Sequence, residues 1–491
     1  MLKTPITIAC SLVLFSTSFE LLATETLSVE QKIAALEAQN KLLLERLSAL
    51  DAKLSKQTTS SDPSIITVKD VATAPVQESE DSKNFVQVNH DYGYAMLDPL
   101  RNINRKELVL LEQKKQGQLN ADTIYLSGAG TGIVNYQRSN TESKFGYLMR
   151  HPTSTNQRTK DASEAVIHSA QFAITANLDS WLSAYTEFLY SPELSFGAGT
   201  ITTVTRNQVQ VHQGYVLLGD LNESPFYASL GKMAVPFGLT DTVSPFTQST
   251  VYHAFGGLAY GLKGGYSHDN LNITAMAVQG GAQFRAANVP VDGSSVPSKL
   301  NNYAVDANYT FAVNPNTDLQ LGGSYIKGSA YCQSFPVTHF TGCKEANGAF
   351  AVYSTLDIGQ WHVKTEFAKT EHMWLGTFNP TIPQFAASKV DSLDLGVGYH
   401  STMAGNPLYY SFEFSQFNSG PNDSPWERQD QWVLGLAYFP MGSAKFFTEV
   451  IQTRGYAPLN FISGGNLGDG VSWSVNDAAS TVVMLGTNIA F

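Results

Sequence analysis

Apolar and polar residues alternate along most of the chain after residue 120, which is the period of a β-strand with one apolar face. The alternation is clearest in segments 303–311, 393–400 and 408–415. In 393–400, for example, Leu, Leu, Val and Tyr at the odd positions alternate with Asp, Gly, Gly and His at the even positions. The pattern predicts a series of amphipathic strands throughout 121–491.

The connections between these strands alternate between short and long. Seven short ones carry the turn-forming residues Gly, Pro, Asn and Asp, and they lie near 177–180, 221–225, 269–270, 314–316, 359–360, 404–407 and 440–443. Eight longer loops lie near 138–163, 192–206, 239–256, 285–299, 332–348, 375–388, 418–428 and 456–478. Together they join about sixteen antiparallel strands, with fourteen and eighteen as alternatives. This asymmetry is typical of bacterial outer-membrane barrels.

The end of the chain supports the same class of protein. The hydrophobic residues of 483–491 share one face, and Gly486, Ile489 and Phe491 resemble the C-terminal assembly signal of outer-membrane barrels. That signal combines a glycine, alternating hydrophobic residues and a terminal aromatic residue. We therefore expect an all-β transmembrane β-barrel at 121–491, in contact with lipid in the bacterial cell outer membrane.

The residues before the barrel predict three further segments. Residues 1–23 have the charge and apolar core of a signal peptide. Residues 24–56 carry leucine heptads with one polar seam residue, Asn40, which is typical of a coiled coil with a fixed register. We expect a homo-oligomer, dimer or trimer, although one helix packing on its own chain is the alternative. Residues 57–120 read as a polar linker and a pre-barrel segment, with a possible short helix in 108–119.

The charge distribution and the cysteines exclude one class of partner and predict a disulfide. Charged residues make up 26 of the 97 residues in 24–120 but only 45 of the 371 residues in 121–491. The net charge of −11 argues against binding to nucleic acid, because it repels phosphates. Loss of the signal peptide leaves Cys332 and Cys343, which predict a disulfide in an exported protein.

Motifs for catalysis are weak. The glycines of 128–132 lie between strand-like segments rather than before a helix, so they do not form a nucleotide-binding loop. The glycine-rich segment 464–470 has one carboxylate where a calcium site needs several. The sequence therefore predicts neither an enzyme nor a cofactor or metal site.

The polar faces of the strands are expected to line the lumen. Charges at these positions form either a wet pore wall or a site for an anionic solute, and both interpretations stay open. Lys232 is included because a charge at mid-strand is costly on the lipid face, and loop 239–256 is the candidate for an inward-folded constriction. The lumen candidates are Lys232, Lys263, Lys364, Glu366, Asp394, His400 and Glu413.

The whole arrangement resembles the siderophore-porin family typified by the legiobactin receptor. The closest local likeness lies in 226–266, at Tyr-Ala-Ser-Leu-Gly-Lys (227–232), Phe-Gly (237–238) and Ser-Pro-Phe-Thr (244–247). The resemblance implies an outer-membrane receptor that takes up iron as a ferric siderophore of the polycarboxylate type, without the energy-coupled machinery of larger receptors.

Two further expectations accompany this resemblance. Larger receptors carry a globular plug in the lumen, whereas the residues before this barrel are largely assigned to a coiled coil and a linker, so we expect no plug. Two other functions remain open from the sequence: a trimeric diffusion porin selective for another small anion such as phosphate, and a structural or adhesive barrel.

Overall fold

The computed structural model describes residues 85–142, 159–191, 209–279, 299–334, 345–376, 386–457 and 474–491. The predicted signal peptide, the coiled coil with Asn40 and the second cysteine, Cys343, lie outside the described residues. Cys332, which ends the 3₁₀ helix η2 (Ala330–Cys332), is disulfide-bonded. Its pairing with Cys343 stays a prediction.

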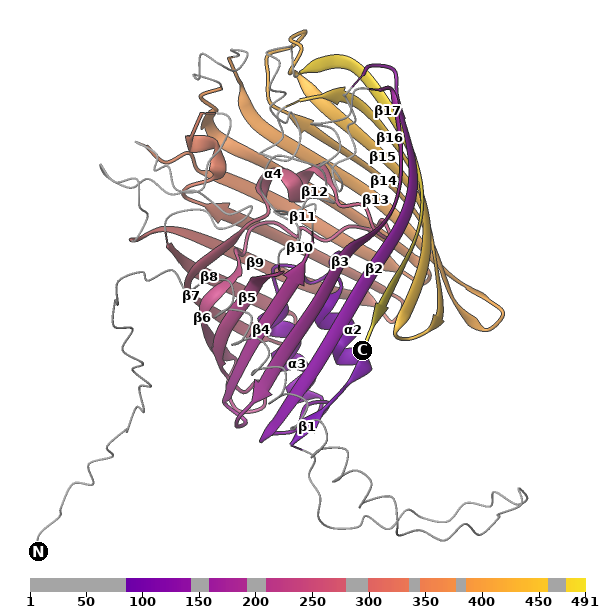
Figure 1. Cartoon of the computed structure of the whole chain (residues 1–491). Helices are drawn as coiled ribbons and strands as arrows, with labels where there is room; N and C mark the ends of the chain where they lie inside the picture. The colour runs from indigo at the N-terminus through magenta and orange to yellow at the C-terminus, as the bar shows by residue number, and fades with distance from the viewer. Residues whose placement is uncertain are drawn as a thin grey trace, which may run out of the picture. The chain divides into compact units, whose positions relative to one another are not determined.

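Sixteen strands, β2 to β17, form a closed antiparallel barrel in the described chain (Figure 1). The barrel closes because β17 pairs with β2, with Ile489 opposite Gly130. The strands are β2 (Thr123–Ser139), β3 (Asp161–Asn177), β4 (Leu182–Tyr190), β5 (Val209–Leu218), β6 (Phe226–Ala234), β7 (Leu258–His268), β8 (Leu271–Gln279), β9 (Leu300–Asn314), β10 (Thr317–Ile326), β11 (Ala349–Ile358), β12 (Trp361–Met373), β13 (Lys389–Met403), β14 (Asn406–Asn418), β15 (Arg428–Met441), β16 (Ala444–Tyr456) and β17 (Val475–Ala490).

The connections confirm the strand count read from the turns. The short connections fall at the seven predicted turns, and the longer connections fall at the eight predicted loops. Both ends of the barrel sheet therefore lie on the short-turn side, which faces the periplasm in barrels of this class.

The two faces of the sheet have opposite character. On β9, Tyr303, Val305, Tyr309 and Phe311 point outward and are 39–46 % exposed, whereas Asp306 between them is buried inside. An apolar outer surface on a closed sheet suits lipid, because no backbone group is left unpaired against hydrocarbon. The protein is therefore located in the bacterial outer membrane.

Among the residues that the structure describes, no helix has the length and hydropathy needed to cross a membrane.

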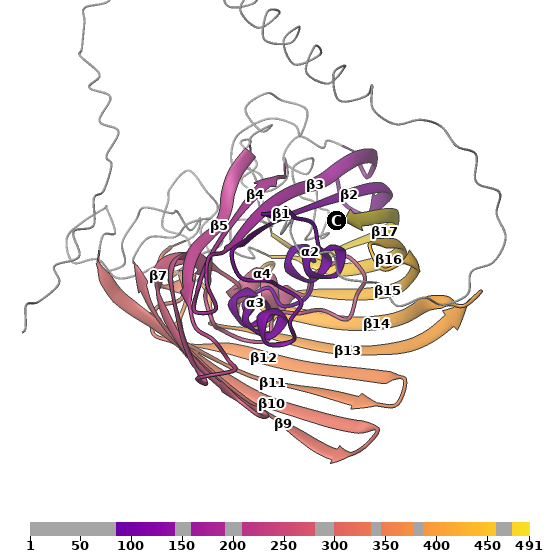
Figure 2. The same cartoon turned by 90° about the horizontal axis from the view of Figure 1, so that it is seen from below.

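Two segments fill the lumen (Figure 2). The first, residues 85–120, contains β1 (Val86–Gln87), α2 (His90–Leu97) and α3 (Lys106–Lys115), and we call it the plug. The second, residues 235–257, connects β6 to β7, contains α4 (Thr250–Phe255), and is called the inner loop. The inner loop confirms the predicted constriction at 239–256.

The plug corrects the expectation that the residues before the barrel form no plug. Asn89 caps α2 by accepting a hydrogen bond from the backbone N–H of Tyr92 (3.0 Å), and the Tyr92 hydroxyl lies 2.7 Å from Thr175 Oγ1 on β3. Short β1 adds a parallel pairing with β2, with Val86 opposite Ile124. The plug is therefore tied to the wall at its start.

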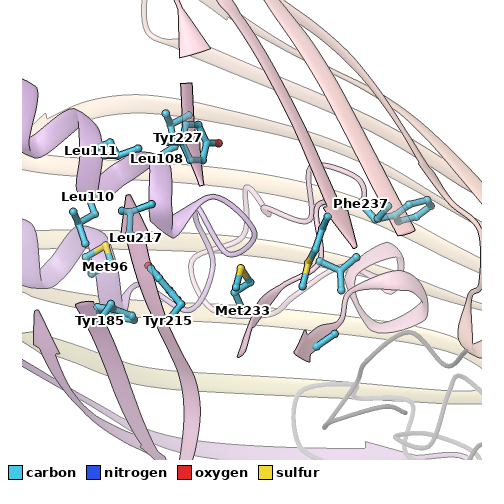
Figure 3. Packing of buried hydrophobic residues seen from close by; sticks show 14 of the residues in the cluster. Met96, Leu108, Leu110, Leu111, Tyr185, Tyr215, Leu217, Tyr227, Met233 and Phe237 are labelled. Atoms are coloured by element: carbon cyan, nitrogen blue, oxygen red, sulfur yellow. The ribbon is translucent and has the colours of Figure 1, made fainter. Parts of the chain in front are cut away.

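Apolar packing holds the two helices of the plug against strands β2 to β6. Met96, Leu108, Leu110 and Leu111 are buried in one cluster with wall residues (Figure 3). Each such side chain contributes about 1.5–3 kcal/mol when it leaves water. The wall residues in this cluster that Figure 3 labels are Tyr185, Tyr215, Leu217, Tyr227 and Met233.

The last residue, Phe491, extends the pairing of β17 with β2, and its ring lies beside Gly128 of β2. Gly128 N–H donates to Phe491 O (2.9 Å), and Phe491 N–H donates to Gly128 O (2.8 Å). A Cβ atom at Gly128 would lie 2.3 Å from Cζ of the Phe491 ring, and one at Gly93 of α2 would lie 2.5 Å from Phe491 O. The C-terminus is thus packed between β2 and the plug, while its role as an assembly signal, with Gly486 and Ile489, stays a prediction.

Replacing Gly128 with Ala should displace the Phe491 ring and cost about 1–3 kcal/mol of stability, because the new methyl group overlaps the ring. Heat-modifiable migration of the purified protein measures this as a lower transition temperature. Gly130→Ala is the matched control, since a Cβ there meets nothing within 4 Å. Equal transition temperatures for the two variants would show that the ring contact does not stabilise the barrel.

Candidate functional site in the lumen

Carboxylates on alternate strands of the wall hold the inner loop. Glu366 on β12, Glu413 on β14 and Glu449 on β16 point inward and are at most 2 % exposed. Each accepts hydrogen bonds from the inner loop. A buried carboxylate is stable only when its oxygens are paired in this way.

Glu366 binds the start of the loop. Its Oε1 accepts from Leu239 N–H (2.8 Å) and its Oε2 from Thr240 N–H (3.2 Å). Gly238 has φ 70°, and a Cβ atom there would lie 2.2 Å from Glu366 Oε1. Glycine is therefore needed for the backbone to approach the carboxylate this closely.

Glu413 and Glu449 bind the middle of the loop. Glu413 Oε2 accepts from Ser244 N–H (2.8 Å) and from the hydroxyl of Thr242. Glu449 Oε1 accepts from Phe246 N–H (2.7 Å), and its Oε2 accepts from the Thr247 hydroxyl (2.5 Å). The middle of the loop is thus fixed to inward carboxylates on two alternate strands, β14 and β16.

Lys364 and Asp394 complete this group of charges. Lys364 Nζ lies 2.6 Å from Asp394 Oδ2 and 3.3 Å from Glu366 Oε2, and it also donates to the carbonyl oxygen of Asp241. Lys364 and Asp394 are at most 1 % exposed. Four of the predicted lumen candidates, Lys364, Glu366, Asp394 and Glu413, therefore meet at the inner loop.

A second group of charges holds the plug. Lys106 Nζ lies 2.7 Å from Glu187 Oε2 on β4. Glu187 is fully buried, and its oxygens also contact Tyr185 Oη (2.9 Å), Gln171 Nε2 (3.1 Å) and His212 Nδ1 (2.7 Å). Lys106 is the cation from the plug in this otherwise wall-derived network.

Two further ion pairs involve α3 and the residue before it. Lys263 Nζ on β7 lies 2.7 Å from Glu107 Oε1. Arg105 Nη2 lies 2.8 Å from Asp241 Oδ2 of the inner loop. Burial opposes the charge of Arg105, but Asp241 and Asp306 more than offset this effect and raise the pKa of Arg105 above its ordinary value.

The plug and the inner loop are also bonded to each other. Asn104 Nδ2 donates to Gly238 O (2.7 Å), Thr242 N–H donates to Leu100 O (3.2 Å), and Gln248 Nε2 donates to Pro99 O (2.9 Å). With the Arg105–Asp241 pair, these bonds make one connected assembly inside the barrel. Movement of either segment therefore breaks bonds of the other.

The remaining predicted site residues lie in different places. Lys263 pairs with the plug, and His400 points into the lumen and is exposed there. Lys232 is on the opposite side of the sheet from the predicted one: it shares its face with the outward Leu230 and stands opposite the outward Tyr260.

The physical reason for the Lys232 correction is local. Its ammonium donates to Val211 O (2.8 Å), and only 7 % of the residue is exposed. The ammonium charge is therefore satisfied by a backbone carbonyl on the outer face. This hydrogen bond offsets the cost of a charge facing lipid, which was the reason for predicting an inward Lys232.

Sequence reasoning placed a short helix in 108–119, close to the observed α3, but it missed the position of this segment in the lumen, and it also missed Glu449. The alternation on β16 places Glu449 between outward Thr448 and Val450, so the same rule that selected Glu413 could have found it. The plug gave a weaker signal, since Leu108, Leu110 and Leu111 are spaced for neither a single helix face nor a strand.

The closed sheet, its apolar outer surface and its polar lumen define an outer-membrane β-barrel of the porin type. No protein-family model matches the chain. A UPF0422 protein of Coxiella burnetii is 24 % identical over 194 residues, which span 38 % of this chain and 38 % of that protein. The match thus covers about two fifths of the relative's length.

Two solved structures are similar in architecture. The anion-selective porin from Comamonas acidovorans has 12 % identity and a TM-score of 0.47, with 75 % of this chain and 99 % of that chain covered. The outer membrane channel DcaP of Acinetobacter baumannii has 11 % identity and a TM-score of 0.46, with 75 % and 97 % covered.

Replacing Lys106 with Met should loosen the plug, because it leaves Glu187 buried without its lysine. Loss of one partner of a buried pair costs about 3–5 kcal/mol. Limited proteolysis of the full chain should then cleave within 85–120 faster than in the wild type. The double variant Lys106→Met/Glu187→Gln should restore much of the protection, and Lys115→Met, at an exposed position, should not change it. Equal cleavage of all variants would contradict a docking role for this pair.

Proposed function

We propose that the protein takes up iron as a ferric siderophore across the outer membrane, through a lumen that is closed at rest and opens when the inner loop and the plug move. The coarser part of this function, a barrel of the porin type in the outer membrane, follows from the fold. The finer part rests on the resemblance to siderophore porins and on the contents of the lumen.

The observation that carries the proposal is where the resemblance falls. The likeness at 244–247 covers the residues that bind Glu413 and Glu449, and the likeness at 237–238 directly precedes the residues that bind Glu366. These residues hold the loop in the lumen. A shared sequence at these positions therefore supports a shared way of closing the barrel, rather than a general likeness among strands.

The filled lumen favours a selective receptor over a general diffusion porin. A diffusion porin keeps a water-filled channel. Here Thr247, Thr250 and His253 of the inner loop are fully buried, and so is much of the plug. Small ions should cross such a barrel poorly unless these elements rearrange.

The first test is uptake of iron. A strain that lacks the protein should accumulate less iron from a radiolabelled ferric polycarboxylate siderophore under iron limitation, and the wild-type gene should restore uptake. Unchanged uptake in the deletion strain would refute the siderophore assignment.

The second test is conductance in planar bilayers. The wild-type chain should show small or rare openings, and Glu413→Gln/Glu449→Gln should open more often, because the inner loop loses charge-assisted hydrogen bonds of about 1.5–3 kcal/mol each. The control is Thr448→Ser, because Thr448 is next to Glu449 in the chain but points outward, away from the inner loop. A large steady conductance of the wild type would favour the diffusion-porin alternative.

A further inference from the structure

The plug leaves one side of the lumen open to water. Inward residues of β2, β4 and β5 beneath the plug, Tyr125, Tyr185 and Tyr215, are at most 4 % exposed. Across the barrel, near the short-turn end, inward Asp357 and His400 are exposed, and the side chain of His362 is 25 % exposed. The inward side chains of Asp357, His362 and His400, at the short-turn ends of β11, β12 and β13, are therefore in contact with water, and we call them the exposed wall.

The exposed wall ends at the inner loop. Lys364 and Asp394 lie farther along the same wall and are at most 1 % exposed, and Lys364 donates to the carbonyl oxygen of Asp241. The inner loop therefore lies beyond the exposed wall, farther from the short turns.

Arg101 of the plug lies beside the exposed wall, and the carboxylate of Asp98 is the strongest charge that acts on its guanidinium. Its guanidinium carbon lies 5.9 Å from the centre of the Tyr409 ring. The next two cations of the plug, Arg105 and Lys106, form ion pairs at 2.7–2.8 Å. Within the described part of the chain, the Arg101 side chain forms neither an ion pair nor a hydrogen bond, and the residue is exposed although it lies inside the barrel.

The neighbours of Arg101 form a surface for a planar anion. The His400 ring lies 4.7 Å from the Tyr409 ring, measured between centres, and Arg101 lies within electrostatic range of His400. Aromatic rings beneath a guanidinium fix its plane. The planar fork then presents two N–H groups to an oxyanion.

Nearby carboxylates are already engaged. Asp98 accepts from Leu100 N–H (3.0 Å) and is 7 % exposed. Asp357 Oδ1 lies 2.7 Å from His362 Nδ1. Lys445, on the same side, donates to Pro245 O (2.9 Å). Among the described cations of this region, Arg101 is therefore the one whose side-chain N–H groups have no hydrogen-bond partner and can donate to a solute.

We propose that Arg101, with Tyr409 and His400, forms a carboxylate-binding site beside the exposed wall. The site contacts an anionic solute on the periplasmic side of the inner loop and contributes to selectivity. It extends the proposed function by naming a contact for the solute, but it is tested by binding rather than by uptake.

The test uses the full chain in detergent and citrate as the carboxylate probe, with affinity measured by calorimetry at low ionic strength. Arg101→Gln should weaken citrate binding at least tenfold. Arg101→Lys, which keeps the charge but loses the fork, should fall between Arg101→Gln and the wild type. Lys115→Gln is the matched control, because it removes one exposed charge from the plug and should change the affinity less than twofold. Heat-modifiable migration of each variant confirms that the barrel is folded.

The outcomes separate the alternatives. No measurable citrate binding by the wild type, or equal binding by Arg101→Gln and the wild type, would overturn the site. Inorganic phosphate that binds as tightly as citrate and depends equally on Arg101 would overturn the preference for carboxylates. Failure of siderophore uptake with Arg101-dependent citrate binding would refute the proposed function and leave the site intact.

Discussion

Buried carboxylates on the inner wall are the constraint on which the rest of the lumen depends. Glu187, Glu366, Glu413 and Glu449 lie in a region where an unpaired charge costs several kcal/mol. Each is satisfied by a group that the plug or the inner loop supplies. The wall therefore requires the elements inside it, and those elements cannot leave without exposing the carboxylates to water or to another ligand.

This requirement links closure of the lumen to its opening. The plug and the inner loop are bonded through Asn104, Arg105 and Leu100, so the strands, the plug and the loop form one network. Water can reach the carboxylates once the loop moves, and hydration then replaces the lost hydrogen bonds at a modest net cost. Such a network is stable when closed and still compatible with a gated passage.

The barrel was predictable because it depends on local, periodic signals. Alternation, turn residues and the terminal Phe491 are each readable from neighbouring positions, and they gave the strand number and the loop that folds inward. Inward orientation followed for Glu366, Asp394 and Glu413 from the same alternation. Lys232 was placed inside by another rule, the cost of a charge on the lipid face, and that rule failed because a carbonyl on the adjacent strand binds the ammonium on the outer face.

Sequence alone determined that the chain closes into a sheet with one apolar and one polar face, since each residue's side is set by its position along the strand. Only the tertiary structure decided what fills the lumen. The partners of Lys106 and of Glu449 lie 81 and 202 to 203 residues away, and no local pattern encodes such a separation. The wall curves around the plug and contacts its helices on several sides. These helices therefore lack the single apolar stripe by which an amphipathic helix is recognised in a sequence.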